Sequence, residues 1–241
     1  MIYQENKSEL DQKGFSIINS IYSSEEIESI CKFIDAQNSE NPTFRKSDDL
    51  FAIRQFLKEL PEIKSLVFNE KLKSIIESIA GKDYFVIKSI YFDKPEKSNW
   101  FVSYHQDLTI SVDKKENIEG FGPWTSKYNQ FAVQPTLDIL ENIFTVRIHL
   151  DKTDKDNGAL KVIDESHSKD IYRTETINWK TEKESFCNVE AGGIMLMKPL
   201  LLHGSNRTSN NKRRRVIHIE FSNKTLPSPI NWSEFSKIWN E

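Results

Sequence analysis

The hydrophobic pattern of the first third of the chain predicts helices. Ser23, with Glu26 three residues later, has the spacing of a capping box, and the apolar residues after it recur every three or four positions. A second helical stretch is expected before Pro61, and a third is expected to end at Gly81. Residues 1–81 are therefore expected to be mainly helical. The apolar faces consist of Ile27, Ile30, Cys31 and Ile34 in the first helix, Phe51, Phe56, Leu57 and Leu60 in the second, and Leu72, Ile75, Ile76 and Ile79 in the third, which starts near Glu70.

From about residue 83 to 222 the pattern changes to that of a β core. Short segments that are rich in β-branched and aromatic residues, or that alternate, are separated by turn signals. Helices followed by many short strands are typical of a β sandwich or barrel with helices along one face. The expected strands are Tyr84 to Phe92, Phe101 to Tyr104, Ile143 to Leu150, Ala159 to Ile163, Gly193 to Lys198 and Arg214 to Phe221.

The segment from Ser111 to Pro135 has little apolar periodicity and is expected to be a long loop. A loop of this length inside a compact domain is usually either functional or disordered. Its aromatic residues favour a functional loop, and an aromatic flap that only covers the end of the barrel is the alternative.

Composition narrows the class of protein. The 241 residues suit one domain spanning 1–241, and the net charge of -3 leaves no excess of basic groups for nucleic-acid phosphates. Cys31 and Cys187 form neither a disulfide framework nor a thiolate zinc motif, which favours a reducing cytoplasm. Without a signal-like start or an apolar run of ~20 residues, neither secretion nor membrane insertion is expected.

His105-Gln106-Asp107 is the most informative polar motif. Residues two apart in an extended strand point to the same face, so His105 and Asp107 project together. A second histidine, His203, follows the apolar run Leu200 to Leu202, which is expected to be a short strand. Two histidines and a carboxylate form the three-ligand face that leaves Fe(II) open positions for a co-substrate and oxygen. Each histidine taken alone could equally be a hydrogen-bonded structural residue.

Arg214, eleven residues after His203, begins a strand with two different faces. The apolar face is expected to pack on the core, and the polar face is expected to look into a functional cavity. A guanidinium there can hold the distal carboxylate of a dicarboxylic co-substrate through two parallel hydrogen bonds. The alternative is that Lys212 to Arg215 is only a solvated basic run. Alternation places Arg214, Val216, His218 and Glu220 on the polar face and Arg215, Ile217, Ile219 and Phe221 on the apolar face.

The strand that begins at Thr145 also has one polar face. It carries Thr145, Arg147, His149 and Asp151. His149 and Asp151 could in principle mimic the His-x-Asp pair. They rank below the first pair because the opposite face looks like core and no matching turn and arginine follow.

Taken as a set, motifs between about residues 85 and 222 resemble those of the phytanoyl-CoA dioxygenase family. The resemblance implies a mainly β fold with flanking helices, whose core is a double-stranded β-helix (a cupin-like jelly roll) that binds non-haem Fe(II) and 2-oxoglutarate. One departure is visible, because the family's usual Pro-Gly-Ser-His turn reads Asp164-Glu165-Ser166-His167 here, which affects the local loop shape more than the activity. The motifs are Phe92-Asp93-Lys94, Asn99-Trp100, Tyr104-His105-Gln106-Asp107, Gly122-Pro123-Trp124, Thr145 to Asp151, Asn157 to Ile163, Ser166-His167, and His203-Gly204-Ser205 with Arg214.

The resemblance also implies roles for single residues. His105, Asp107 and His203 match the family's iron ligands, and Arg214 matches the arginine that grips the C5 carboxylate of 2-oxoglutarate. Retention of Asp107 indicates hydroxylation or a related oxidation, since halogenases on this scaffold have a small residue there. The residues expected to contact 2-oxoglutarate are Arg214, Ser205 and Thr145.

The expected activity is that of a dioxygenase that uses Fe(II), 2-oxoglutarate and O2. It would hydroxylate or otherwise oxidise a C–H bond of a small molecule and release succinate and CO2. An acyl-CoA substrate is disfavoured because the sequence shows no separate basic surface for nucleotide phosphates beyond Lys212 to Arg215. No obligate protein partner is indicated. The candidate substrate residues are Lys94, Asn99, Trp124, Arg147 and His218.

Two other classes stay open from the residues alone. A non-catalytic cupin-like binding protein could use the triad for a structural metal. A zinc hydrolase also suits two histidines and a carboxylate, but it lacks a nearby general base with a recognisable spacing and leaves Arg214 without a role.

Overall fold

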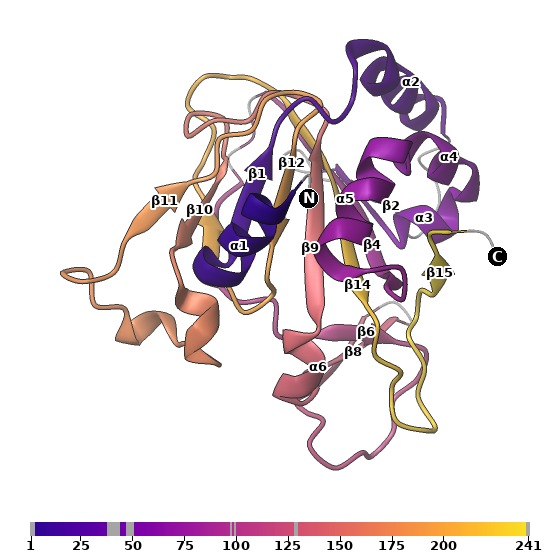
Figure 1. Cartoon of the computed structure of the whole chain (residues 1–241), viewed down its shortest axis with the longest axis vertical. Helices are drawn as coiled ribbons and strands as arrows, with labels where there is room; N and C mark the ends of the chain where they lie inside the picture. Colours follow the sequence, from indigo (N-terminus) through magenta and orange to yellow (C-terminus); the bar gives the residue numbers. More distant parts are fainter. Residues whose placement is uncertain are drawn as a thin grey trace.

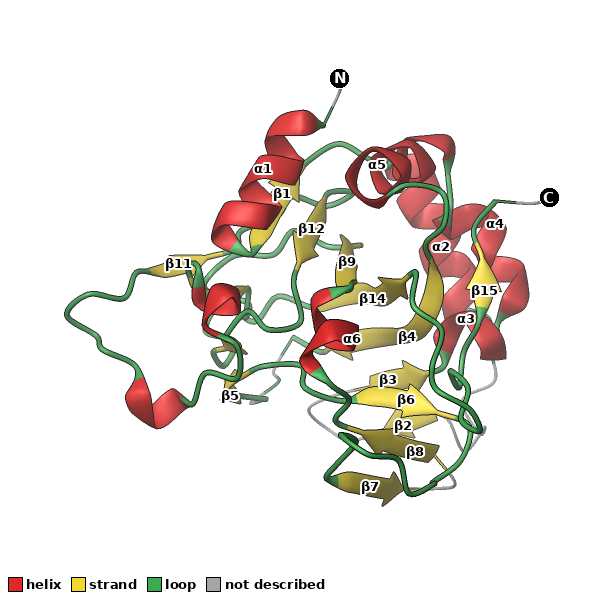
Figure 2. Cartoon of the chain, turned by 60° about the horizontal axis from the view of Figure 1, so that its bottom comes forward, coloured by secondary structure: helices red, strands yellow, loops and turns green. Residues whose placement is uncertain are grey.

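Three antiparallel sheets form the centre of the molecule, and helices cover one outer face of the largest sheet (Figures 1 and 2). The computed structural model describes residues 3–37, 44–46, 51–96, 98, 100–127 and 130–239. The expectation of a mainly β fold with flanking helices and a jelly-roll core is confirmed. The α-helices are α1 (Gln4–Lys13), α2 (Ser24–Asp35), α3 (Phe56–Glu59), α4 (Lys64–Val67), α5 (Glu70–Ala80) and α6 (Leu137–Glu141), and 3-10 turns span Pro61–Ile63, Ser166–Lys169 and Thr174–Thr176.

The largest sheet forms one wall of the site. Its strand order is β1-β12-β9-β14-β4-β3-β2, and β15 pairs with β4. The strands β14, β9 and β4 lie side by side at its centre and present alternate residues to the interior. The bounds are β1 (Phe15–Ile18), β2 (Phe44–Lys46), β3 (Phe51–Arg54), β4 (Phe85–Lys94), β9 (Ile143–His149), β12 (Ile194–Met197), β14 (Arg214–Ser222) and β15 (Ser236–Lys237).

A smaller sheet faces the large one and carries the predicted histidines. Its order is β11-β10-β13-β5, so β13 and β5, which are far apart in the sequence, are neighbours. A buried cluster of Leu160, Val162, Met195 and Met197 fills the interior between β10 and β12. The bounds are β5 (Val102–His105), β10 (Leu160–Ile163), β11 (Glu184–Phe186) and β13 (His203–Ser205).

Helices α2 to α5 pack on the outer face of the large sheet, as the amphipathic patterns predict. The capping box at the start of α2 is formed, because Ser23 Oγ accepts from Glu26 N–H while the Glu26 side chain accepts from Ser23 N–H. Ile217 and Ile219 of β14 are fully buried against these helices.

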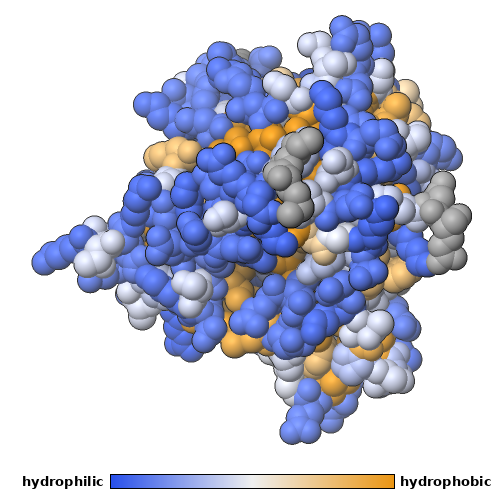
Figure 3. All heavy atoms as spheres, viewed as in Figure 1, coloured by the Kyte–Doolittle hydropathy of each residue, from blue (hydrophilic) through white to orange (hydrophobic). Residues whose placement is uncertain are grey.

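The surface of the molecule is mainly hydrophilic on the side that Figure 3 shows, which is the side seen in Figure 1. Among the described residues, no helix has both the length and the apolar character needed to cross a bilayer.

The helical interpretation of the first third is wrong for the residues around Phe51. Phe51–Arg54 forms β3, which pairs with β4, and Phe51 contacts the ring of Tyr91 edge-on. Only from Phe56 onward is the stretch helical. Strand pairing with β4 therefore overrides the apolar spacing that suggested a helix.

One segment that was expected to be a loop and one that was expected to be a strand also differ from the prediction. The segment from Ser111 to Pro135 is not one long loop, because β6 (Ile110–Val112), β7 (Trp124–Lys127) and β8 (Gln130–Val133) form a third sheet. In contrast, Leu200 to Leu202 is a turn and not a strand, although its three side chains are buried. The apolar character of these short segments does not show whether they form strands or turns.

Candidate metal centre

The two histidines of the predicted triad lie opposite each other on neighbouring strands. His105 ends β5 and His203 begins β13, and the antiparallel register pairs them directly. Their ring centroids are 4.3 Å apart. A Cβ atom on Gly204 would lie 2.9 Å from the carbonyl oxygen of Val102, so glycine allows the two strands to approach this closely.

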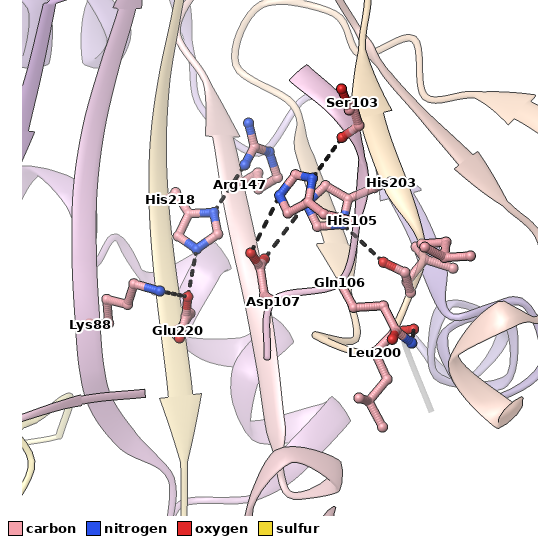
Figure 4. Close-up of polar contacts among 12 residues, drawn as sticks. Lys88, Ser103, His105, Gln106, Asp107, Arg147, Leu200, His203, His218 and Glu220 are labelled. Carbon is pink, nitrogen blue, oxygen red and sulfur yellow. Dashed lines mark hydrogen bonds and ion pairs between the residues drawn. The ribbon is translucent and has the colours of Figure 1, made fainter. Parts of the chain in front are cut away.

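Asp107 completes the group from two residues beyond β5. Its carboxylate oxygens lie 3.8 Å from His105 Nε2 and 3.7 Å from His203 Nε2 (Figure 4). These separations are long for hydrogen bonds, but two ligands that are each about 2.1 Å from one ion can be up to about 4.2 Å apart. The Asp107 N–H donates to the Pro199 carbonyl at 2.9 Å, which ties Asp107 to the turn before His203.

Both imidazoles present Nε2 to Asp107 because Nδ1 is held by the main chain. His105 Nδ1 lies 2.9 Å from the Ser103 carbonyl, and His203 Nδ1 lies 2.9 Å from the Leu201 carbonyl. A carbonyl only accepts, so each Nδ1 carries the proton and each Nε2 offers a lone pair. Burial lowers the pKa of His203 to about 4, which keeps this ring neutral at neutral pH.

Asp107 is held in its ionised form. Burial raises its pKa, but the electrostatic effects of His203, when that ring is protonated, and of the Lys88 ammonium outweigh burial and hold the pKa of Asp107 below its usual range. The side chain of His105 is 43% exposed, whereas that of His203 is 6% exposed. The group therefore opens toward solvent on the His105 side.

Gln106, between the two ligands, points away from them and fastens the surrounding loops. Its side-chain amide donates to the carbonyls of Asp170, at 2.8 Å, and Leu200, at 2.5 Å, and its oxygen accepts from the Tyr172 N–H at 2.9 Å. The sequence predicts that this side chain points away, but it gives no sign of these partners. Gln106 positions the strand end that carries His105 and Asp107.

Arg214 lies inside the cavity, as its strand alternation predicts. Its side chain is buried, and its NH1 group donates to the carbonyl of Gly158. Burial lowers the pKa of Arg214 to about 9, with a smaller effect from the like charge of Arg147, so the group stays cationic at neutral pH. No carboxylate of the described residues pairs with it. Ser205 lines the same cavity and is buried.

The polar face of β9 forms the floor of the interior. Arg147 is buried, and its NH1 group donates to His218 Nδ1 at 3.0 Å. Three buried polar atoms on this face have no hydrogen-bond partner, which is unusual for buried groups and points to a site for a polar ligand. They are Thr145 Oγ1, Arg147 Nε and His149 Nε2.

A buried chain of hydrogen bonds continues from Arg147 to β4. His218 Nε2 lies 3.0 Å from Glu220 Oε1, which also accepts from Lys88 Nζ at 2.7 Å (Figure 4). Burial, opposed by Glu220, lowers the pKa of His218. The sequence analysis did not identify Lys88 and Glu220 as site residues. Lys88, Ile90 and Phe92 alternate along β4, and all three line the cavity.

The candidate residues fall into two groups. Arg147 and His218 line the cavity of about 200 Å³ that also contains the triad. Lys94 does not line it, since its Nζ donates to the carbonyls of Trp100 and Asn206. Trp124 packs on a separate apolar cluster with the third sheet. Asn99 lies outside the described residues.

The competing His-x-Asp pair does not form a ligand pair. Asp151 accepts two hydrogen bonds from the Arg215 side chain, at 2.9 and 2.8 Å. His149 Nδ1 instead lies 2.8 Å from Thr153 Oγ1. His105 and Asp107 are therefore the better metal candidates.

The donor set fits a divalent transition metal. The ligand atoms of His105, Asp107 and His203 lie within 4.8 Å of one another. Two imidazole nitrogens and one carboxylate suit Fe(II), and Zn(II) accepts the same ligands. A second group of Asp107, His218 and Glu220 satisfies the same distance limit, but His218 and Glu220 are already bonded to each other and to Arg147 and Lys88.

Comparisons with known proteins agree with this geometry. The sequence profile described as Phytanoyl-CoA dioxygenase (PhyH) matches residues 10–216, which confirms the resemblance carried by the motifs. Among curated proteins, none matches the sequence.

Several solved structures have a similar fold. EctD from S. alaskensis has 16% identity and a TM-score of 0.72 over 95% of this chain and 80% of its own. HygX from Streptomyces hygroscopicus, solved with nickel and 2-oxoglutarate bound, has 13% identity and a TM-score of 0.64, with 92% and 87% covered. SnoK, a non-heme alpha ketoglutarate dependent carbocyclase from nogalamycin biosynthesis, has 15% identity and a TM-score of 0.64, with 91% and 83% covered.

Proposed function

Because the chain belongs to the phytanoyl-CoA dioxygenase family, we propose that it is a non-haem Fe(II)- and 2-oxoglutarate-dependent dioxygenase that oxidises a C–H bond of a small molecule. One observation carries this proposal. The His105, Asp107 and His203 group shares a cavity with Arg214, a buried arginine that has no carboxylate partner among the described residues. A structural metal site or a zinc hydrolase has no need of this second feature.

The iron ligands are proposed to be His105, Asp107 and His203. Their Nε2 atoms and carboxylate face one another within reach of a single ion. Bound Fe(II), with 2-oxoglutarate and O2, would supply the oxidising chemistry that attacks the substrate C–H bond and releases succinate and CO2. The remaining task of the protein is to bind and orient the substrate and to exclude water from the site.

Arg214 is proposed to hold the far carboxylate of 2-oxoglutarate. Its guanidinium presents donors in a fork that matches a carboxylate, and burial strengthens that attraction. Ser205 lines the cavity beside it and can donate to the same carboxylate, and Thr145 has a free buried hydroxyl for a further contact. Arg147 and His218 are left for the substrate.

The activity test is release of succinate from 2-oxoglutarate by the iron-loaded protein in air. With a small molecule that it can oxidise, the wild-type protein is expected to produce succinate. His105→Ala removes an iron ligand on the exposed side of the group and is expected to abolish succinate formation.

His167→Ala is the matched control. His167 lies outside the cavity, with Nε2 3.1 Å from the Asp11 carbonyl, so this variant is expected to keep its succinate production. Wild-type protein that makes no succinate with a broad panel of small molecules, although it binds iron, would refute the proposed function.

A further inference from the structure

One buried positive charge in the cavity is not used by the proposed iron or 2-oxoglutarate. Arg147 lies on β9 with its side chain inside the cavity and is 7% exposed. Its NH1 group is bonded to His218, and its Nε has no partner. Among the described residues, no carboxylate forms an ion pair with it. A buried charge in a protein is normally paired, so this arginine is prepared for an anion that comes from outside.

The neighbours of Arg147 fix its position without neutralising it. Burial lowers the pKa of Arg147 to about 10, against the opposite charge of Asp107, so the side chain stays cationic at neutral pH. His218, its hydrogen-bond partner, has a pKa lowered by burial and brings no charge at neutral pH. Glu220, next along the chain of hydrogen bonds, is paired with Lys88.

When Fe(II) and 2-oxoglutarate are bound, the charge of Arg147 is the one that no other group in the cavity balances. Fe(II) has two positive charges and 2-oxoglutarate two negative charges, while Asp107 contributes one negative charge and Arg214 one positive charge. These four therefore cancel. Lys88 and Glu220 cancel as a pair. The cavity then keeps a single positive charge, at Arg147.

Arg147 and Arg214 serve different parts of the cavity. Arg147 is paired in register with His218, which is four residues along β14 from Arg214. Four residues of an extended strand span about 13 Å. Arg147 and Arg214 therefore enter the cavity from backbone positions that are well separated along the sheet.

We propose that the substrate of this oxygenase carries a carboxylate, which Arg147 binds. The inference rests on the proposed function and adds the chemical class of the substrate. A carboxylate matches the single unpaired charge, whereas a phosphate monoester would bring between one and two negative charges. Arg147 is then the residue that selects acids over neutral compounds of the same shape and orients them beside the metal group.

The test is calorimetry with small acids and their amides. The full chain is loaded with Fe(II) and saturating 2-oxoglutarate under nitrogen, and acetate, propionate and benzoate are titrated in parallel with acetamide, propionamide and benzamide. Each acid is expected to bind one site about tenfold or more tightly than its amide, which corresponds to a difference of about 1.4 kcal/mol. The 2-oxoglutarate must stay bound throughout.

Three variants assign the preference to one side chain. Arg147→Met should remove the preference for acids while the affinity for 2-oxoglutarate stays within about twofold, and Arg147→Lys should restore part of the preference because it restores the charge. Arg215→Met is the matched control, because Arg215 faces away from the cavity and pairs with Asp151. This control should behave like the wild-type protein.

The outcomes separate this inference from the proposed function. Wild-type protein that binds iron but not 2-oxoglutarate would overturn both. Wild-type protein that binds 2-oxoglutarate but treats acids and amides alike would overturn the inference alone. So would acids that displace 2-oxoglutarate, or an Arg147→Met variant that loses 2-oxoglutarate as strongly as it loses the acids, since Arg147 would then belong to the co-substrate.

Discussion

At the scale of single residues, the site is built from charges that the folded chain leaves uncompensated. Arg214 and Arg147 are both buried, and each donates a hydrogen bond only to a neutral group among the described residues. Such groups cost folding free energy and are retained where a ligand supplies the missing charge. The two buried arginines of the cavity therefore indicate that its ligands are anions.

The substitution Arg214→Met tests whether the buried charge weakens folding and strengthens ligand binding. Loss of the guanidinium is expected to weaken 2-oxoglutarate binding by about 2 to 5 kcal/mol, which is at least about 30-fold, while iron binding is retained. The free energy of unfolding of the metal-free variant should be unchanged or higher, because an unpaired buried charge has been removed. Calorimetry and urea unfolding measure the two effects, and Arg215→Met serves as the control. Equal affinity for 2-oxoglutarate in the variant and the wild type would remove the role given to Arg214.

At the scale of elements, strand register brings the site together. His105 and His203 are almost a hundred positions apart in the chain and become partners because β5 and β13 pair. Alternation along β14 and β9 predicts which side chains face inward, and the structure confirms this for Arg214 and Arg147. The pairing of strands is a tertiary property, so the sequence could not show that Lys88 of β4 lies beside Glu220 of β14. The same limitation explains why Phe51 was expected in a helix.

The segment after β14 is a further element that depends on one buried carboxyl group. Glu234 accepts hydrogen bonds from the N–H and hydroxyl groups of Ser89 on β4, at 2.8 and 2.5 Å, and Ser89 Oγ in turn accepts from the Leu57 N–H at 2.8 Å. Burial raises the pKa of Glu234 to about 7. This raised pKa means that the folded state holds a proton that the unfolded state releases at lower pH.

Glu234→Gln is expected to flatten the pH dependence of stability. The stabilisation from protonated Glu234 is complete below its unfolded value of 4.5 and is lost as the pH rises through about 7. The wild type should therefore lose on the order of 3 kcal/mol relative to the variant between about pH 4.5 and about pH 8. Urea unfolding at both ends of this range provides the measurement. A difference between variant and wild type that does not change with pH would show that Glu234 is not protonated in the folded protein.

At the scale of the whole molecule, the helices stabilise the large sheet from outside and leave its inner face for ligands. Ile217 and Ile219 pack against the helices, whereas Arg214 and His218 on the same strand line the cavity. The alternating pattern of this strand and the amphipathic helices made the mainly β architecture predictable. The third sheet was not predictable, because Ile110 and Val112 alternate over only three residues, which is too short a signal against a polar background.

Ligands that bind only the folded molecule should stabilise it as a whole. Ni(II) added at about 100 times its dissociation constant is expected to raise the free energy of unfolding by about 2.7 kcal/mol, and 2-oxoglutarate should add to this only when the metal is present. Urea unfolding with and without a chelator measures both steps, and His105→Ala should show neither. Equal stabilisation of the wild type and this variant by the metal would place the ion elsewhere.

The central claim is that one cavity holds Fe(II) on His105, Asp107 and His203 and 2-oxoglutarate on that iron and Arg214. The most direct measurement is visible absorption while 2-oxoglutarate is titrated into the Fe(II)-loaded protein under nitrogen. A weak charge-transfer band should appear and saturate at one 2-oxoglutarate per chain, and it should require a much higher concentration in Arg214→Met. Wild-type protein that binds Fe(II) but develops no such band with saturating 2-oxoglutarate would contradict the account.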